Sequence, residues 1–481
     1  LASAAATFAQ GSLTPPGAPA PTMKTLDQLE PRTPLQAGAP GVTQNANGGF
    51  TISQPGSYYL TANLAVDSGD GISILSRNVT LDLGGFTIAS SEGTPASAGI
   101  QAGSSTNLLI RNGRITSGST YGFLIGIAST NGSSTTVEDV LVQGLAQDGI
   151  ATVATIRNCS ASNCGGTGLR AAGTVTNSTA YYCGGEGIVG GTVENCRASE
   201  IVGIAISSSG AASNCYGVSS GDTAISAYTA VNCVGYGVPA GAAGVSANDV
   251  DTCYGFSSDG TGILATNVAN STGQTTNGQG IRATSVTNSY GRSSAGTGIN
   301  ASNVANSYGN STSATGITAS AVAGSFGQSS AGTGIETSSV SDSRGFSTSG
   351  IGINTTTADN CTAFTATGAY GLKASGTVQN CRATVTTGGA VTTYAIYCQA
   401  ALNCSGEIRD VTASPQTCYG LFAFSAGNCY GSSSSGFGIQ VMSTATGCYG
   451  TSTSGTGLDA GTADTCSGMS TSGNGLRANL A

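Results

Sequence analysis

The cysteines are the residues of this chain with the widest chemical range, and there are fifteen of them. A thiolate can act as a nucleophile or bind a soft metal ion. Eleven cysteines share one column with six serines, in steps of 18 to 20 residues that widen to 23 and 25 around Cys404. The cysteines of this column are Cys159, Cys196, Cys215, Cys233, Cys253, Cys361, Cys381, Cys404, Cys429, Cys448 and Cys466. Because serine replaces them in the middle of the chain, we interpret the column as a structural ladder of small, inward-packed side chains.

Four cysteines lie outside this column and are candidates for disulfides. Cys164 and Cys183 each lie five residues past the column in adjacent repeats, and Cys398 and Cys418 lie in the two longer repeats. Neighbouring turns of a stacked coil bring Cα atoms within the distance that a disulfide requires. The odd total leaves at least one thiol unpaired or intermolecular. The chain has no CxxC zinc pattern, and we expect no metal or cofactor.

Charged residues recur two positions before the cysteine column or its upstream equivalent. In successive repeats they are Asp82, Arg111, Glu138, Arg157 and, after Thr176, Glu194. Their signs alternate, which is typical of solvated ion pairs between repeats, each worth at most about 1 kcal/mol. We therefore expect a structural charge ladder and no catalytic residue in this column.

Hydroxyl side chains form two further columns. The first contains Ser257, Thr275, Ser293, Ser311, Ser329 and Ser347, and the second contains Ser258, Thr276, Ser294, Thr312, Ser330 and Thr348. Regular hydroxyl rows could bind ice or sugars, but we favour a solvated or glycan-bearing face that packs tightly between repeats.

Aromatic residues form a partial column of Tyr254, Tyr290, Tyr308 and Phe326. Sequence alone leaves open whether these rings point inward or outward. If they point outward, they could form a lateral contact strip.

The composition excludes several classes of function. Only 8% of the 481 residues are charged, against about 25% in ordinary domains, and histidine and tryptophan are absent. Without histidine there is no Ser-His-Asp triad and no histidine metal site. A net charge of -8 offers no basic surface for nucleic acid. No apolar stretch approaches the roughly 18 residues of a transmembrane helix.

An 18-residue repeat provides the scaffold for all of these columns. Ile263, Ile281, Ile299, Ile317, Ile335 and Ile353 each follow a glycine and stand 18 residues apart. The unit contains two or three short strand-like pieces and no helical apolar stripe. We predict an all-β fold: a single elongated parallel β-helix (β-solenoid) over residues 46–481, with about 21 turns of about 18 residues.

Asparagine precedes the Cys/Ser column in most repeats. The positions are Asn158, Asn177, Asn195, Asn214, Asn232, Asn270, Asn288, Asn306, Asn360, Asn380, Asn403 and Asn428. Asparagine tolerates a left-handed backbone, and stacked amides can bond from turn to turn. We therefore predict a structural corner at this position.

These patterns resemble the right-handed parallel β-helix proteins of the pectate-lyase-like superfamily. The opening turns of secreted bacterial members are similar to the segment from Ile52 to Ile88, ISQPGSYYLTANLAVDSGDGISILSRNVTLDLGGFTI. The leader of an uncharacterised group of these members is similar to the segment that begins at Leu13, LTPPGAPAPTMKTLDQLEPRTP. The resemblance implies the fold and export. Pectin-cleaving relatives use calcium-binding carboxylates with an arginine base, or several aspartates, but no such motif is matched here. The 18-residue repeat also fits the alternative fold, a left-handed β-helix built from hexapeptide repeats.

The ends of the chain differ from the repeats. Residues 1–10 are similar to the end of a signal peptide, with a mature tail as the alternative. Residues 11–45 form a proline-rich tail, in which Met23, Leu26 and Leu29 indicate a short capping helix. The last residues repeat the turn motif. An open last turn could pair with another copy, and the alternative is a cap formed by folding back of the last few residues.

We therefore expect a secreted, non-enzymatic structural protein at the cell surface or outside the cell. Copies would assemble head-to-tail into a filament or surface layer through the N-terminal tail and the C-terminal turn. The alternatives are a polysaccharide lyase or hydrolase on the same fold, which would need a carboxylate cluster, and a glycan-binding adhesin. The acidic residues after Glu194 are scattered singly, which favours the structural role.

Overall fold

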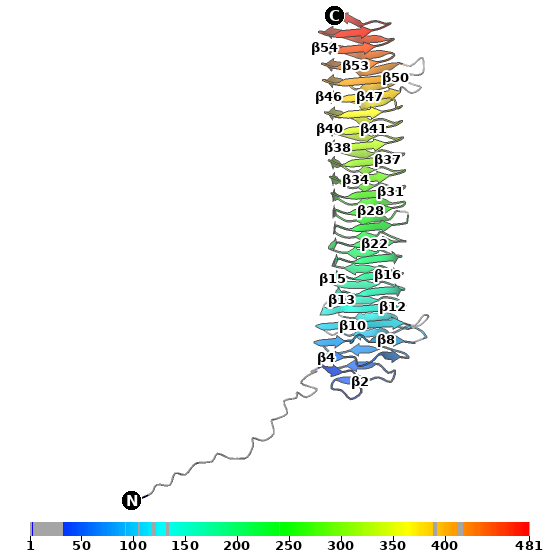
Figure 1. The fold of residues 1–481 in the computed structure, drawn as a ribbon, viewed down its shortest axis with the longest axis vertical. Helices are drawn as coiled ribbons and strands as arrows, with labels where there is room; N and C mark the ends of the chain where they lie inside the picture. Colours follow the sequence, from blue (N-terminus) through cyan, green and yellow to red (C-terminus); the bar gives the residue numbers. More distant parts are fainter. Residues whose placement is uncertain are drawn as a thin grey trace.

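A computed structural model of the chain places short strands in a straight stack of turns (Figure 1). The structure describes residues 2, 32–91, 93–103, 106–117, 122–130, 134–239, 241–387, 392–410 and 417–480. Strands run from β1 (Thr33–Pro34) to β58 (Leu476–Leu480), and the described residues contain no α-helix. The stack has about 21 turns that lie about 19 residues apart, so the prediction of a parallel β-solenoid is confirmed. At about 4.8 Å per turn, the rod is about 100 Å long.

Three strands make up each turn in the regular middle of the rod. The turn after Cys253 contains β28 (Tyr254–Ser257), β29 (Thr261–Leu264) and β30 (Asn267–Ala269). The next turn repeats them as β31 (Thr272–Thr275), β32 (Ile281–Arg282) and β33 (Ser285–Thr287), paired in parallel with their equivalents. The three sheets built in this way are called the first, second and third faces, in this order.

The core is a set of identical side chains stacked from turn to turn. The isoleucines from Ile263 to Ile353 on the second face are fully buried, and the valines from Val268 to Val340 on the third face are at most 3% exposed. Parallel pairing places each of these residues opposite its equivalent, as Ile263 opposite Ile281 and Val268 opposite Val286. Each added turn therefore extends one continuous apolar column.

Glycines allow the first and second faces to approach each other closely. A Cβ on Gly255 of the first face would overlap the carbonyl oxygen of Gly262 on the second face. A Cβ on Gly262 would in turn overlap the backbone nitrogen of Gln274. The backbones of the two faces are thus in direct contact, which only glycine permits at these positions. This thin cross-section explains many of the 75 glycines.

The corner between the third and first faces has a left-handed backbone, as predicted. The residue before the Cys/Ser column has a positive φ in all 17 turns, and where it is not asparagine it is Thr252, Gly324, Asp342, Gly447 or Thr465. The Asn232 amide donates to Asn214 Oδ1 at 2.7 Å, and the Asn403 amide donates to Asn380 Oδ1 at 3.1 Å. The corner is therefore held by side-chain hydrogen bonds between turns.

The N-terminal part of the rod begins within the segment predicted to be a tail. Strand β1 pairs in parallel with β4 (Gly56–Tyr59), and β2 (Val42–Gln44) pairs with β3 (Phe50–Ile52) in the one antiparallel pairing between described strands. The proposed capping helix and nearly all of segment 1–10 lie outside the described residues. Within the described residues, no helix is long and apolar enough to cross a membrane.

Candidate functional site

The cysteine column lies inside the corner that follows the left-handed residue. Ten of its eleven thiols are at most 4% exposed, and Cys466 is partly exposed. The Cys253 thiol donates to the Asp251 carbonyl at 3.2 Å, and the Ser289 hydroxyl makes the equivalent bond to Thr287 at 2.7 Å. Burial raises the pKa of Cys159 to about 12. Serine and cysteine are interchangeable here because both satisfy the same backbone carbonyl.

The four cysteines outside the column are free thiols in the structure, as are the other eleven. Cys164 lies directly opposite Cys183 on adjacent turns, but no two cysteines of the described residues lie at disulfide distance, so the predicted disulfide is not supported. The second predicted pair is wrong. Cys418 lies opposite Thr393, at the start of β48 (Thr393–Tyr397), whereas Cys398 follows the end of that strand. The two thiols are therefore separated by about five residues along a strand, or about 16 Å.

The charge ladder is in register as predicted, because Asp82, Arg111, Glu138, Arg157, Thr176 and Glu194 face one another in sequence. Asp82 pairs with Arg32 at 2.8 Å and with Arg111 at 3.4 Å. Burial opposes ionisation of Asp82, but hydrogen bonds from Gly84 and Asn112 and the two guanidinium groups lower its pKa overall. Among the described residues, Asp82–Arg111 is the one ion pair within this column, and Asp82 is buried. The expectation of a ladder of solvated ion pairs is therefore wrong for Glu138, Arg157 and Glu194, which are in register but unpaired.

The first hydroxyl column lies inside the rod, so the expectation of a solvated face is wrong for it. Its six residues are at most 3% exposed. The Ser329 hydroxyl donates to the carbonyl of Ala314 at 2.6 Å and accepts from the amide of Gly332 at 2.8 Å. Two backbone groups at a bend thus satisfy each buried hydroxyl. The second column is exposed or partly exposed.

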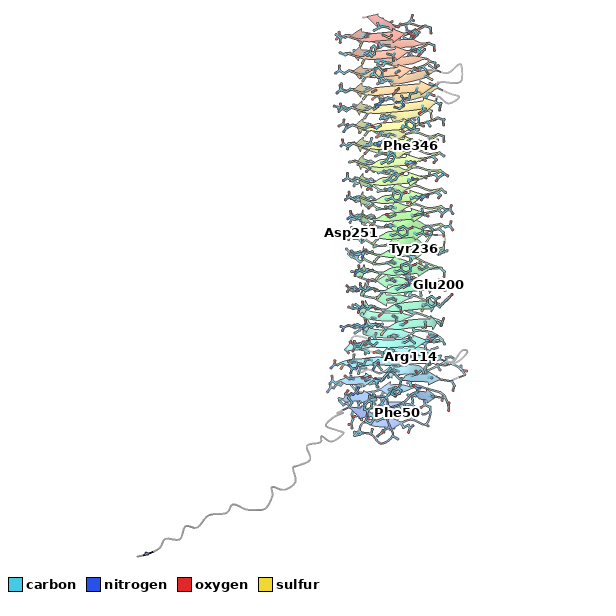
Figure 2. The ribbon with its side chains drawn as sticks, in the orientation of Figure 1. Phe50, Arg114, Glu200, Tyr236, Asp251 and Phe346 are labelled. Atoms are coloured by element: carbon cyan, nitrogen blue, oxygen red, sulfur yellow. The ribbon has the colours of Figure 1, made fainter. Side chains whose placement is uncertain are left out.

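The predicted aromatic column lies on the outer surface of the first face. Tyr290 stacks on Tyr308 and Tyr308 on Phe326, with ring centroids 5.0 Å apart in both pairs. A second outward column on this face includes Tyr236 and Phe346, labelled in Figure 2. The rings of this column therefore point outward, a question that the sequence alone left open.

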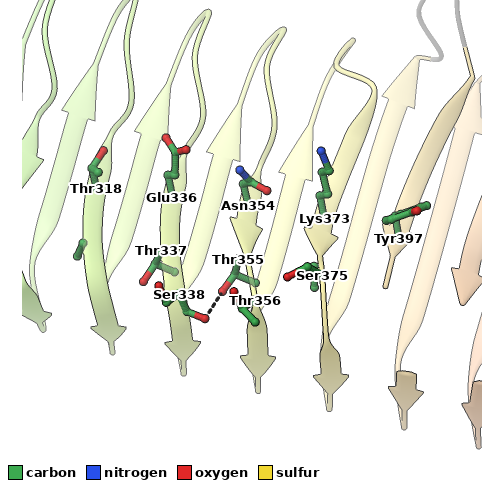
Figure 3. A pocket seen from close by; sticks show the side chains of 12 residues that line it. Thr318, Glu336, Thr337, Ser338, Asn354, Thr355, Thr356, Lys373, Ser375 and Tyr397 are labelled. Atoms are coloured by element: carbon green, nitrogen blue, oxygen red, sulfur yellow. Dashed lines mark hydrogen bonds between the residues drawn. The ribbon is translucent and has the colours of Figure 1, made fainter. Parts of the chain in front are cut away.

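The second face carries a groove of about 530 Å³ that sequence analysis did not identify. We call it the polar groove, and Figure 3 shows it from close by. One outward residue from each of five successive turns forms its side: Thr318, Glu336, Asn354, Lys373 and Tyr397. The corner beneath them contributes Ala319, Thr337, Ser338, Thr355, Thr356, Ala374 and Ser375.

The strands of the second face determine the order of these side chains. They come from β38 (Ile317–Ala323), β40 (Ile335–Ser341), β42 (Ile353–Thr355), β45 (Tyr370–Ala374) and β48. In each strand a fully buried residue precedes the groove residue, as Ile335 precedes Glu336 and Ile353 precedes Asn354. Alternation along the strand therefore directs the groove side chains outward.

The polar side chains of the groove are not paired with one another. Among the described residues, no hydrogen bond or ion pair holds the side chains of Glu336, Asn354 or Lys373. Glu336 and Lys373 are two turns apart, about 10 Å, with Asn354 between them. The Lys373 ammonium lies 5.2 Å from the ring centroid of Tyr370. One carboxylate and one ammonium give the groove both signs of charge and no net charge.

An aromatic patch adjoins the groove on the second face. It consists of Tyr370, Tyr394, Tyr397, Tyr419, Phe422 and Phe437, all partly exposed. Tyr370, Tyr394, Tyr419 and Phe437 stack in one row, with centroids 4.8 to 5.3 Å apart. Tyr397 and Phe422 stack in a second row at nearly right angles to the first. Burial raises the pKa of Tyr394 to about 12, so its hydroxyl stays protonated.

The fold and these stacked columns define the class of protein as a parallel β-solenoid. No family model matches this chain, and no curated protein or solved structure matches it. Within the described part of the chain, no three or more histidine, cysteine or acidic residues lie together in a way that could hold a metal ion.

Proposed function

We propose that this chain is a secreted, non-enzymatic structural protein, a right-handed β-helix of the pectate-lyase-like superfamily that forms part of an extracellular filament or surface layer. The main support is the continuity of its ladders. The isoleucine column, the Cys/Ser column and the left-handed corner continue through successive turns, and equivalent residues make the same contacts in each turn. A chain built in this way produces length and rigidity from repetition.

The polar residues of the interior support this role because they bond to the scaffold. The hydroxyls of the first hydroxyl column each join two backbone groups, and the corner amides bond to the turn before. Asp82 likewise contacts two arginines and an asparagine. These groups contribute to holding turns in register, which is what a load-transmitting rod requires.

Assembly would follow from the same geometry. Each turn presents a parallel strand edge to its neighbour, so a second copy stacked along the axis would extend all three faces. A head-to-tail interface that does not close produces a filament.

The location of the protein is tested by immunogold labelling of the intact organism that produces it. Label outside the cell envelope, on fibres or a surface layer, is the expected result. Label confined to the cell interior would contradict export, and with it the extracellular role.

A further inference from the structure

We propose that Lys373 and Asn354 of the polar groove join in an isopeptide bond that the chain forms by itself, with Glu336 as the proton carrier. This inference goes beyond the structural role and does not depend on filament formation. It rests on the order of three chemically different side chains on three successive turns. It also rests on their having no hydrogen-bond or ion-pair partner within the described residues.

The register of the second face brings the reacting side chains together. Asn354 lies directly opposite Lys373, and Glu336 lies directly opposite Asn354. Neighbouring strands are about 4.8 Å apart. Lysine has a flexible stem of four carbons, so its amine can bend back over the shorter side chain of Asn354. Figure 3 shows the three side chains in this order on neighbouring strands, pointing away from the sheet in the same direction.

Charge favours the bent arrangement of Lys373. The ammonium of Lys373 and the carboxylate of Glu336 are opposite in sign and two turns apart, with the neutral Asn354 between them. A lysine that leans toward the carboxylate therefore places its amine over the carboxamide of Asn354. The ring of Tyr370, 5.2 Å from the ammonium, is its neighbour in the structure. No hydrogen bond within the described residues has to break before Lys373 leans over.

The three groups supply everything that the reaction requires. Glu336 takes a proton from the ammonium, and the neutral amine attacks Cγ of Asn354. The protonated Glu336 donates to the carboxamide oxygen and then gives its proton to the departing nitrogen. The new C–N bond joins Lys373 to Asn354, and the old C–N bond of the carboxamide breaks. One ammonium and one carboxamide thus become one secondary amide and one ammonium ion, with no change of oxidation state and no further reactant.

A second pair in the same column shows why the lysine is decisive. Arg282 lies opposite Asn300 exactly as Lys373 lies opposite Asn354, and both pairs are on the second face. A guanidinium stays protonated and is no nucleophile, so the Arg282 pair cannot react. Lys373 is the one lysine among the described residues. The reaction is therefore expected at a single place in the described part of the chain.

Mass spectrometry of the full chain tests the proposal. We expect the folded protein to be lighter than its sequence mass by one ammonia molecule. Trypsin is expected to leave residues 345–382 as one peptide, also lighter by one ammonia, because a linked Lys373 is no longer a cleavage site. Lys373→Arg, Asn354→Ala and Glu336→Gln are each expected to have their full sequence mass. In Asn354→Ala, trypsin should produce residues 345–373 and 374–382 separately.

The matched control is Asn300→Ala, which removes the asparagine opposite Arg282 and is expected to keep the loss of ammonia. Circular dichroism shows whether each variant keeps its strands. The proposal is overturned if the folded wild type has its full sequence mass, or if Asn300→Ala abolishes the loss. It is also overturned if Lys373→Arg still loses ammonia, since an asparagine would then have cyclised onto its own backbone. Complete linkage in Glu336→Gln would overturn the role of the carboxylate. Imaging of filaments from Lys373→Arg separates this inference from the structural role, because assembly is expected to survive the change.

Discussion

The hydroxyl of Ser293 donates a 2.8 Å hydrogen bond to the carbonyl of Gly278, one turn earlier, and accepts a 2.8 Å bond from the amide of Gly296. One buried hydroxyl thus links two turns. Ser293→Ala would leave both backbone groups without their partner inside the rod, and we expect a loss of about 1–3 kcal/mol. Urea unfolding followed by circular dichroism measures this loss.

The control for this change is Ser294→Ala, because Ser294 is exposed in the neighbouring column. Its effect is expected to stay within about 0.5 kcal/mol. Equal effects of the two substitutions would contradict the internal role of the hydroxyl column.

The contact between the first and second faces predicts a strong effect of a single methyl group. A Cβ on Gly291 would overlap the carbonyl oxygen of Gly298, so Gly291→Ala must separate the two faces locally. We expect destabilisation by about 1–3 kcal/mol, seen as a lower thermal midpoint. Gly93→Ala is the matched control, since a Cβ there meets no atom within 4 Å. A thermal midpoint for Gly291→Ala equal to that of the control would show that the faces are not in contact.

Asp82 makes the stability of the first turns dependent on pH. Its pKa in the folded chain lies below the ordinary value of 3.8. The stabilisation is therefore present above that ordinary value and is lost as the pH falls through the lower folded-state pKa. At pH 7 we expect Asp82→Asn to unfold at a lower temperature than the wild type, and the difference should shrink as the pH approaches 2. A difference that is constant with pH would argue against the ion pairs with Arg32 and Arg111.

The buried thiols are expected to be unreactive in the folded chain. Fourteen of the fifteen cysteines are at most 4% exposed, so an alkylating reagent does not reach them. Burial also raises the pKa of Cys159 and of Cys398 to about 12, so these two thiols remain protonated at pH 8. Brief alkylation of the reduced, folded protein at pH 8 should label Cys466, the most exposed cysteine, and few others. In guanidinium, all fifteen should react. Mass spectrometry that finds the buried column labelled in the folded state would contradict the structural ladder.

The sequence predicted the parts of the fold that repeat with one residue type. Ile263 and its equivalents, and Asn270 at its corner, recur at a constant step, so their burial and left-handed backbone could be inferred without coordinates. Ser293 was misplaced because a serine in a polar repeat is normally exposed. Its carbonyl and amide partners, Gly278 and Gly296, become neighbours only when the coil closes.

The polar groove had no comparable signal. Glu336, Asn354, Lys373 and Tyr397 share one position of the repeat but have four different chemical types. A search for repeated residue types therefore passes over them. Aligning the turns on the buried isoleucine and reading the residue that follows it would have placed them in one column.

Electron microscopy of the purified full chain over a range of concentrations tests the central claim most directly. The structural account predicts unbranched filaments one rod wide, with an axial repeat of about 100 Å set by the stacked turns, and a fraction of filaments that rises with concentration. Separate rods of that length at every concentration would contradict it.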